Sequence, residues 1–376
     1  MTESSRRDFL KTSATAAVGL ATMPMLPSAL AASSAARLRF GVVGINHSHI
    51  YGMVDAVTRG GGELAIVFVK EPDLLAEFTK KYPSVKVARS EAEVLEDPSI
   101  KLVLSSIVPV ERAPLGIRVM QHGKDYMADK PGITTLEQLA DVRRVQAATK
   151  RIYSIVYSER FENAATVKAA ELVKAGAIGQ VIQTVGLGPH RINPPARPEW
   201  FWDRSKFGGI ICDIASHQFD QFLYFTGSTR ATIVASQVGN VRHKDHPAFQ
   251  DFGDVMVRGN AGTGYIRVDW FTPAGLPTWG DTRLTVLGSD GYIEVRKNVD
   301  LAGREGANHL FLTDQKGVQY IDTKHVDLPF GRLLVDDVLN RTETAMTQDH
   351  CFLAMELALQ AQAKAETITF SSLPTR

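Results

Sequence analysis

The segment RFGVVGINHSHI, residues 39–50, decides the fold of the first half of this chain. Its apolar run ends at Gly44, a pattern typical of a buried strand that leads into a tight turn. A dinucleotide-binding loop would continue from Gly44 as G-x-G-x-x-G, but Asn46 and His49 stand at the second and third glycine positions. The segment therefore leaves three options open: a nucleotide site, a metal site, or a remnant of one.

The pattern around this segment extends to about residue 150. Short β-rich runs alternate with helical stretches, the first of which covers residues 49–59 and is stopped by three glycines. This alternation predicts an α/β domain at residues 36–155, a Rossmann-type doubly wound parallel sheet with helices on both faces. In such sheets phosphate ligands bind at the carboxyl ends of the strands, which is where Gly44 lies.

The remainder of the chain has a different rhythm. A helical segment is followed by a series of β runs separated by glycine-rich turns, and a last helix spans about residues 349–366. We expect residues 156–376 to form a substrate-binding and oligomerisation domain of α+β type. Its sheet should be large, mostly antiparallel and open on one face.

Composition excludes some functions. The 376 residues suffice for two domains, and a net charge of +1 gives no general attraction to nucleic acid or to anionic membranes. The two cysteines, Cys212 and Cys351, have apolar neighbours and are expected to be buried free thiols.

The N-terminus has the features of an export signal. Arg6 and Arg7 precede a mild apolar run, and small residues follow at Ala29-Leu30-Ala31. Residues 1–31 thus resemble a bacterial twin-arginine signal peptide, with an uncleaved amphipathic N-terminus as the alternative. The resemblance implies a periplasmic or extracytoplasmic protein, exported folded, with no membrane anchor after cleavage.

Three segments could carry chemistry. The first is Asp129-Lys130-Pro131, at the end of a predicted strand. Partial burial there would lower the pKa of Lys130 and suit it to proton transfer, although a solvated turn lysine is the simpler interpretation.

The second segment is GGIICDIASHQFDQ, residues 208–221. As one helix it would present Asp213, His217 and Asp220 on a single face. An aspartate beside a histidine can orient the imidazole as a general acid or base, but a structural Asp–His pair is equally consistent with the pattern.

The third segment is GPHRINPPARPEWFWDR, residues 188–204. Arginines and aromatic residues in a proline-stiffened loop suit a sugar ring with its hydroxyls. They also suit a buried loop beneath a domain interface.

In this order, the three segments and the strand-plus-glycine loop resemble the family of glucose–fructose oxidoreductase, inositol dehydrogenase and the rhizopine catabolism protein (Gfo/Idh/MocA). The family usually has Glu-Lys-Pro where this chain has Asp129-Lys130-Pro131, and D-x-G-x-H where this chain has Ala215 at the glycine position. The resemblance implies that Lys130, Asp213 and His217 are catalytic.

The resemblance also implies a tightly bound NAD or NADP. Glu71 would favour NAD by accepting a ribose hydroxyl, Lys70 would favour NADP, and Arg112 stands near the place of a histidine in many relatives. The expected cofactor-binding residues are Gly44, Asn46, His47, His49, Glu71, Pro109, Arg112, Asp129 and Lys130. The expected substrate-binding residues are Arg160, His190, Arg191 and Trp202.

No metal site is expected. If a helix starts at this point, His47 and His49 do not share a face, and the sequence nearby offers no third ligand.

Three functions are compatible with these residues. The first is an NAD(P)-dependent oxidoreductase that acts on a CH–OH group of a sugar, sugar derivative or cyclitol. The second is a redox-neutral glycosidase or lyase that oxidises its substrate transiently. The third is a non-catalytic sugar-binding relative. A homodimer or homotetramer built through the second-domain sheet is expected for each of them.

Overall fold

The computed structural model describes residues 37–369. The predicted export signal at residues 1–31 lies outside this range and stays a prediction, as do the two predicted domain boundaries. Among the described residues, no helix combines the length and apolar character needed to cross a membrane.

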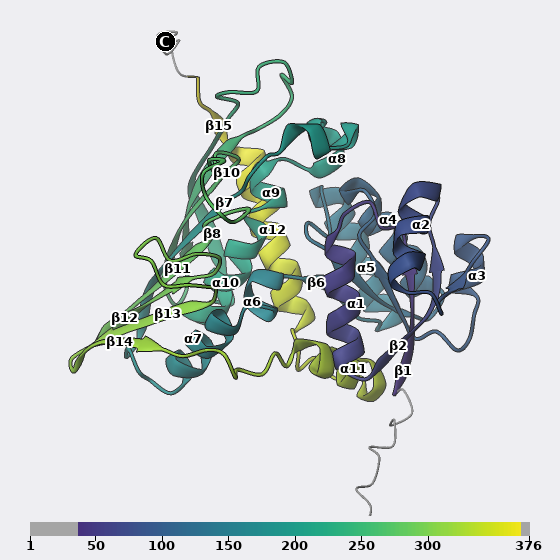
Figure 1. The fold of residues 1–376 in the computed structure, drawn as a ribbon, viewed down its shortest axis with the longest axis horizontal. Coiled ribbons are helices and arrows are strands. Elements are labelled where there is room, and N and C mark those ends of the chain that lie inside the picture. Colours follow the sequence, from purple (N-terminus) through teal and green to yellow (C-terminus); the bar gives the residue numbers. More distant parts are fainter. Residues whose placement is uncertain (1–36, 370–376) are drawn as a thin grey trace, which may run out of the picture. The chain divides into compact units, whose positions relative to one another are not determined.

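The first sheet has six parallel strands in the order β3-β2-β1-β4-β5-β6. This is the strand order of the Rossmann fold, and it confirms the predicted doubly wound sheet. Figure 1 shows this part of the chain in purple and blue. The strands are β1 (Leu38–Val43), β2 (Gly62–Phe68), β3 (Lys86–Val87), β4 (Leu102–Ser105), β5 (Asp125–Asp129) and β6 (Tyr153–Val156).

Helices connect these strands as the alternating pattern predicts. Helix α1 begins at His49 and ends at Arg59, and its buried residues Ile50, Met53, Val54 and Val57 recur at helical spacing. The other helices of this part are α2 (Pro72–Lys81), α3 (Glu91–Leu95), α4 (Pro109–Gln121) and α5 (Leu136–Thr149).

The second sheet has nine strands in the order β14-β13-β12-β11-β7-β10-β9-β8-β15. The β7–β10 and β8–β15 pairs are parallel and all other pairs are antiparallel, so the prediction of a mostly antiparallel sheet is confirmed. The strands are β7 (Val181–Pro189), β8 (Ala231–Gly239), β9 (Phe252–Gly259), β10 (Thr263–Asp269), β11 (Arg283–Gly288), β12 (Gly291–Arg296), β13 (His309–Asp314), β14 (Gly317–Ile321) and β15 (Glu366–Thr367).

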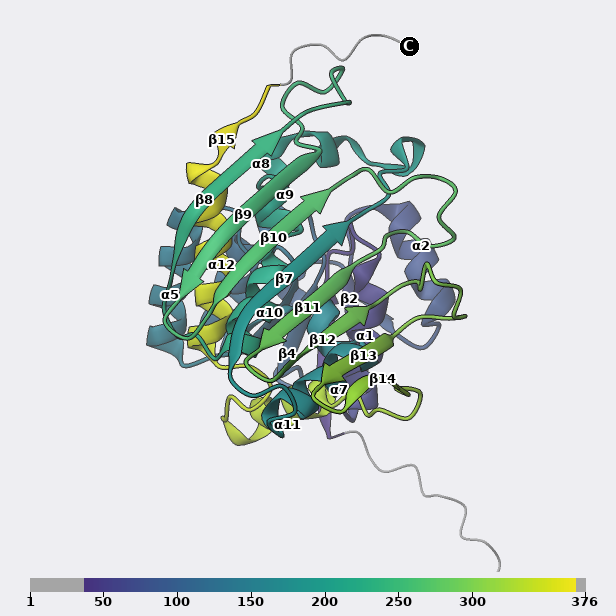
Figure 2. The same cartoon turned by 90° about the vertical axis from the view of Figure 1, so that its left-hand side faces the viewer.

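Helices cover one face of the second sheet. Figure 2 shows the strands on the near side with α10 and α12 behind them, and within residues 37–369 no helix covers the near face. The helices of this part are α6 (Ser158–Phe161), α7 (Ala164–Lys174), α8 (Arg204–Phe207), α9 (Ile210–Asp213), α10 (Ser216–Thr226), α11 (Phe330–Asn340) and α12 (Gln348–Lys364), with 3₁₀ turns η1 (Pro194–Ala196) and η2 (Glu199–Trp202).

The C-terminal helices tie the two sheets together. Helix α12 packs on both α5 and β8, and α11 packs on α1, a helix beside the first sheet. At the α1–α11 crossing a Cβ on Gly331 would lie 1.8 Å from the Ala56 carbonyl oxygen, so only glycine permits this approach. Cys212 and Cys351 are buried free thiols, as expected.

Candidate active site

A cavity of about 510 Å³ lies where the carboxyl end of the first sheet meets the second half of the chain. The first half contributes His47, His49, Pro109, Arg112 and Lys130. The second half contributes Glu159, His190, Asp213, His217, Trp270, Trp279 and Lys297, among others. All three residues expected to be catalytic, which come from distant parts of the sequence, therefore line one cavity.

Lys130 and Asp213 form an ion pair across this cavity. Lys130 directly follows β5, Asp213 is the last residue of α9, and Lys130 Nζ lies 3.1 Å from Asp213 Oδ1. The side chains are only 5% and 14% exposed. Burial works to raise the pKa of Asp213, but the charge and hydrogen bond of Lys130 hold it below its usual value.

The prediction of a single helix after Gly208-Gly209 is wrong. Helix α9 ends at Asp213 and α10 begins at Ser216, so Asp213 and His217 do not share a continuous helical face. Asp213 pairs with Lys130, and no hydrogen bond joins it to His217 among the described residues. The proposed role of Asp213 in orienting the imidazole of His217 is therefore corrected.

His217 is buried and lacks a partner for one ring nitrogen. Its side chain is 2% exposed, and Nδ1 has no hydrogen-bond partner in the described part of the chain. Burial lowers the pKa of His217 to about 4, although the nearby carboxylate of Glu159 works to raise it. The imidazole is therefore neutral at pH 7 and can accept a proton.

A buried polar cluster lies beside His217. Glu159 Oε2 is 2.6 Å from Lys297 Nζ and accepts a hydrogen bond of 2.9 Å from Gln218 Nε2, whereas Glu159 Oε1 has no partner in residues 37–369. Burial works to raise the pKa of Glu159, but the charge and hydrogen bond of Lys297 lower it to about 2. Glu159 is thus a carboxylate with one free oxygen at the cavity wall.

Sequence reasoning missed Glu159 and Lys297. They lie 138 residues apart, and the ion pair forms only because the short helix α6 meets the residue that follows β12. The one local signal is weak: a lysine at the end of a β run, where a charged side chain is ordinarily solvated.

The segment at the end of β1 retains its turn. Gly44 has φ +73°, and a Cβ at this position would lie 2.8 Å from the Ile107 side chain. Asn46 Nδ2 donates a hydrogen bond of 2.9 Å to Glu71 Oε1, while Asn46 Oδ1 is buried without a partner among the described residues. These three predicted cofactor residues lie together but outside the lining of the cavity.

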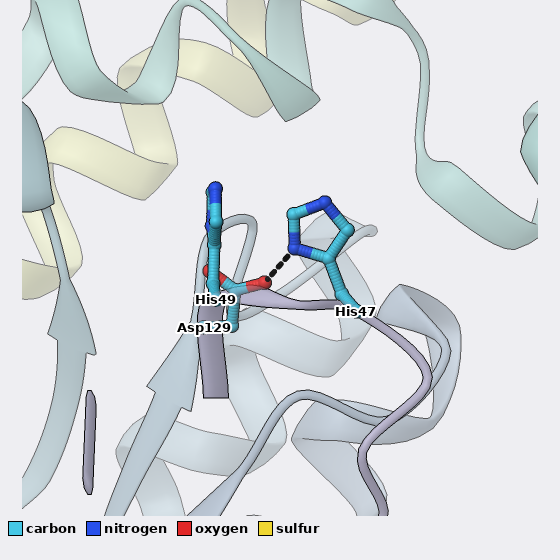
Figure 3. Close-up of side chains that lie close together, drawn as sticks. All are labelled: His47, His49 and Asp129. Atoms are coloured by element: carbon cyan, nitrogen blue, oxygen red, sulfur yellow. Dashed lines mark hydrogen bonds and ion pairs between the residues drawn. The ribbon is translucent and has the colours of Figure 1, made fainter. Parts of the chain in front are cut away.

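Two histidines of this segment contact a single carboxylate (Figure 3). His47 Nδ1 lies 3.0 Å from Asp129 Oδ2, and His49 Nδ1 lies 2.9 Å from Asp129 Oδ1. The nearby sequence offers no third ligand to these histidines, but the fold supplies one. Asp129 is 80 residues further along the chain, and the parallel sheet brings the end of β5 to the end of β1.

Arg112 also contacts this carboxylate. It is 1% exposed, and its Nη2 lies 3.1 Å from Asp129 Oδ2. Burial works to raise the pKa of Asp129, but the charges of His49 and Arg112 and the hydrogen bonds of both histidines hold it well below its usual value. Burial and repulsion from His49 lower the pKa of His47 to about 4.

Two of the four predicted substrate-binding residues, Arg160 and Trp202, do not line the cavity. Arg160 makes a bidentate ion pair with Asp220, with both bonds at 2.7 Å, and does not line the cavity. Trp202 stacks on His246 with ring centroids 3.9 Å apart and is also absent from the cavity wall. In both cases the side chain is used in packing that local sequence cannot predict.

The other two predicted substrate residues do line the cavity. His190 Nδ1 is 3.0 Å from the Gly188 carbonyl oxygen, to which it donates, and its ring packs near Trp270 and Trp279. Burial lowers the pKa of His190 to about 3, so this ring is also neutral. Arg191 reaches the cavity but donates to backbone carbonyls, including that of Leu276.

A Rossmann sheet, an open-faced mixed sheet and a lysine–aspartate–histidine set in the cavity between them together indicate an oxidoreductase of the α/β class. Comparison with known proteins makes this more specific. The Gfo/Idh/MocA C-terminal domain family matches residues 166–294. A crystal structure from Erwinia carotovora atroseptica SCRI1043, provisionally named an oxidoreductase, is 46% identical with a TM-score of 0.86, covering 88% of this chain and 100% of that one.

Two curated enzymes are more distant relatives. The scyllo-inositol 2-dehydrogenase (NAD(+)) of Bacillus subtilis strain 168 is 24% identical over 290 residues, covering 74% of this chain and 80% of the enzyme. The myo-inositol 2-dehydrogenase of Thermotoga maritima is 27% identical over 294 residues, covering 74% and 79%. The chain belongs to the Gfo/Idh/MocA family.

Proposed function

We propose that this chain is an NAD(P)-dependent oxidoreductase that acts on a CH–OH group of a sugar, sugar derivative or cyclitol. The observation that carries the proposal is the Lys130–Asp213 ion pair, in which Lys130 Nζ lies 3.1 Å from Asp213 Oδ1. Both residues line the same cavity as His217. Relatives named as inositol dehydrogenases support the substrate class.

The end of the first sheet fits a dinucleotide. In this fold the adenosine ribose lies at the end of the second strand, beside an acidic residue. Glu71 occupies this place, and the unpartnered Asn46 Oδ1 next to it would accept a hydrogen bond from a ribose hydroxyl. Residues Gly44, Asn46, Glu71, Pro109 and Lys130 would hold the cofactor, and the Glu71 carboxylate favours NAD because it would repel a 2′-phosphate.

The chain's own groups supply proton transfer. A nicotinamide held at this site would supply the hydride acceptor for oxidation of a carbinol carbon. His217, neutral at pH 7, accepts the hydroxyl proton, because Lys130 is held in its ion pair with Asp213. Lys130 donates to the same oxygen and stabilises the negative charge that develops on it.

A second hydroxyl of the substrate would donate a hydrogen bond to Glu159 Oε1. This oxygen and His217 Nδ1 are both buried without partners in the described residues. A buried acceptor gains most from a substrate that brings a donor, so the site selects polyols over substrates with a single hydroxyl. Trp270 and Trp279 add an apolar wall of the kind that suits a ring face.

The proposal is tested by two measurements. Denaturation of the purified protein is expected to release NAD or NADP, which mass spectrometry detects. Inositols and aldoses are then screened for reduction of the bound nicotinamide, followed by its absorbance. A protein that carries no dinucleotide and binds none on addition contradicts the proposal.

We further propose export by the twin-arginine route, based on Arg6, Arg7 and Ala29-Leu30-Ala31. A cofactor that must be retained at low nanomolar free concentration needs binding of about −12 kcal/mol. It would then be restored within each catalytic cycle, so free NADH should not accumulate during turnover. Cell fractionation with and without Arg6→Lys/Arg7→Lys tests the location.

We also propose a homo-oligomer that assembles through the open face of the second sheet. In β9 the neighbours Val255 and Val257 are buried while Met256, which points to the opposite face, is 53% exposed. Tyr292 of β12 is 41% exposed, next to the buried Ile293. Apolar side chains on a sheet face without covering helices are typical of a surface that a second copy covers.

A further inference from the structure

The His47, His49 and Asp129 cluster has the geometry of a metal site. One nitrogen of each imidazole and one carboxylate oxygen all lie within 4.8 Å of one another. The two nitrogen–oxygen distances are 3.0 and 2.9 Å. The two distances run to different oxygens of Asp129, Oδ2 for His47 and Oδ1 for His49. Ligand atoms bound at about 2.1 Å on adjacent positions of an octahedral shell are about 3 Å apart, so each imidazole nitrogen lies at such a spacing from the carboxylate.

We infer that His47, His49 and Asp129 bind one divalent transition-metal ion at the cavity wall. The site takes three residues that the family resemblance assigned to the dinucleotide, and metal binding by them does not depend on the oxidoreductase proposal. Two imidazole nitrogens and one carboxylate oxygen are the donor set of catalytic zinc sites and of the facial triad of non-haem iron. Magnesium and calcium prefer oxygen ligands alone, so zinc, iron, manganese or cobalt is the expected class.

The surroundings of the cluster are those of a built site. Ligating carboxylates in proteins are held by hydrogen bonds from a second layer of residues. Arg112 holds Asp129 in this way and is itself fixed by the carbonyl oxygens of Ile107, Lys130 and Pro131. The backbone carbonyl of His47 accepts a hydrogen bond of 2.7 Å from Ser106 Oγ.

Charge balance gives an independent reason for the cluster. Arg112 supplies one full positive charge to the buried carboxylate of Asp129. Two further imidazoles on the same carboxylate therefore add donor atoms and are not needed to balance its charge. A cation bound between them makes use of all three groups.

The location indicates what the metal would contact. The side chains of His47 and His49 are 25% and 39% exposed and line the cavity that also contains Lys130 and His217. Three protein ligands leave coordination positions open on the cavity side. These positions would take an oxygen of the bound molecule, such as a polyol hydroxyl.

Metal content of the purified chain tests the site. After dialysis against EDTA, the protein is loaded separately with Zn²⁺, Mn²⁺ or Co²⁺, and bound metal is counted by mass spectrometry. The wild type is expected to retain one equivalent of at least one of these ions. His47→Ala and His49→Ala should each weaken binding by more than the roughly 10- to 100-fold that loss of a second-layer partner costs.

His122→Ala is the matched control, because His122 is an exposed histidine at the end of α4 that lies outside the cluster. It should bind metal as the wild type does. Metal retention by His47→Ala and His49→Ala at the level of His122→Ala would overturn the inference. So would a wild type that binds none of the three ions, which would leave the cluster as a hydrogen-bonded triad.

Two further readouts separate the outcomes. Co²⁺ in a nitrogen–oxygen site absorbs visible light, and this absorbance should be absent in the His47→Ala/His49→Ala variant while its melting temperature shows that it remains folded. Dinucleotide content is measured on the same samples. Variants that lose the metal but keep the dinucleotide support the metal site independently of the cofactor site. A wild type that binds metal but contains no dinucleotide contradicts the proposed oxidoreductase function and leaves the metal site supported.

Discussion

The ion pair between Lys130 and Asp213 offers the most direct test of the site. Lys130→Met keeps most of the side-chain volume but removes the cation 3.1 Å from Asp213 Oδ1. At this distance and an effective dielectric constant of about 20, the lost Coulomb attraction is about 5 kcal/mol. Desolvation in the folded state offsets part of it, and loss of one partner of a buried pair costs roughly 3–5 kcal/mol.

Asp213 retains 14% of its exposure, so water can solvate part of the stranded charge. We therefore expect Lys130→Met to lower the free energy of unfolding by about 3 kcal/mol, the lower end of the range, as measured by urea denaturation. Turnover should fall by about 100-fold or more, because Lys130 stabilises charge in the transition state as well as in the ion pair.

Two further variants separate stability from catalysis. Lys130→Met/Asp213→Asn removes the stranded charge and should recover most of the lost stability without recovering activity. Lys168→Met is the control: it removes an exposed ion pair in which Lys168 Nζ lies 2.7 Å from Glu171 Oε2. It should change the free energy of unfolding by less than about 1 kcal/mol. A Lys130→Met variant with near wild-type turnover, or a double variant no more stable than Lys130→Met, would refute the reasoning.

Four further predictions concern the same cavity and the second sheet. The acidic limb of the kcat/KM profile should lie near pH 4, because burial lowers the pKa of His217 to about 4 and only the neutral imidazole accepts a proton; a limb near pH 6.5 would contradict this. Glu159→Gln should raise KM for a polyol about 10-fold or more with a smaller change in kcat, because the subsite loses its charged acceptor. The depressed pKa of Glu159, about 2 against 4.5, means that its contribution to stability is full above pH 4.5 and is lost as pH falls toward 2. The stability difference between wild type and Glu159→Gln should therefore shrink in urea titrations at pH 3, and a constant difference would argue against the ion pair. Met256→Glu should convert the oligomer to monomers by light scattering, and a wild type that is already monomeric at micromolar concentration would exclude assembly through this face.

Periodicity along the chain determined much of the fold. The alternation of β runs and helical segments was sufficient for the Rossmann sheet, and helix α1 spans the predicted residues 49–59. These features depend on neighbouring residues, because a strand or a helix is specified by which of its own side chains become buried. Lys130 and His217 were also found from the sequence, since each stands in a short motif next to a strand or helix end.

Helix breaks depended on the tertiary fold. The segment at residues 208–221 has helical periodicity throughout, yet the chain leaves the helix after Asp213 and begins again at Ser216. In this arrangement Asp213 reaches Lys130 of the first sheet. The partner of Asp213 is 83 positions away, so no short window of sequence contains both residues.

Only the tertiary structure decided which polar groups meet. Asp129 joins His47 and His49 because parallel pairing places the carboxyl ends of β1 and β5 at the same edge of the sheet. Glu159 joins Lys297 for a comparable reason, across 138 residues. The residue types in this sequence determined that buried charges would need partners, since an unpaired charge is costly away from water. The choice of partner depended on distances that arise only when the sheets and helices pack.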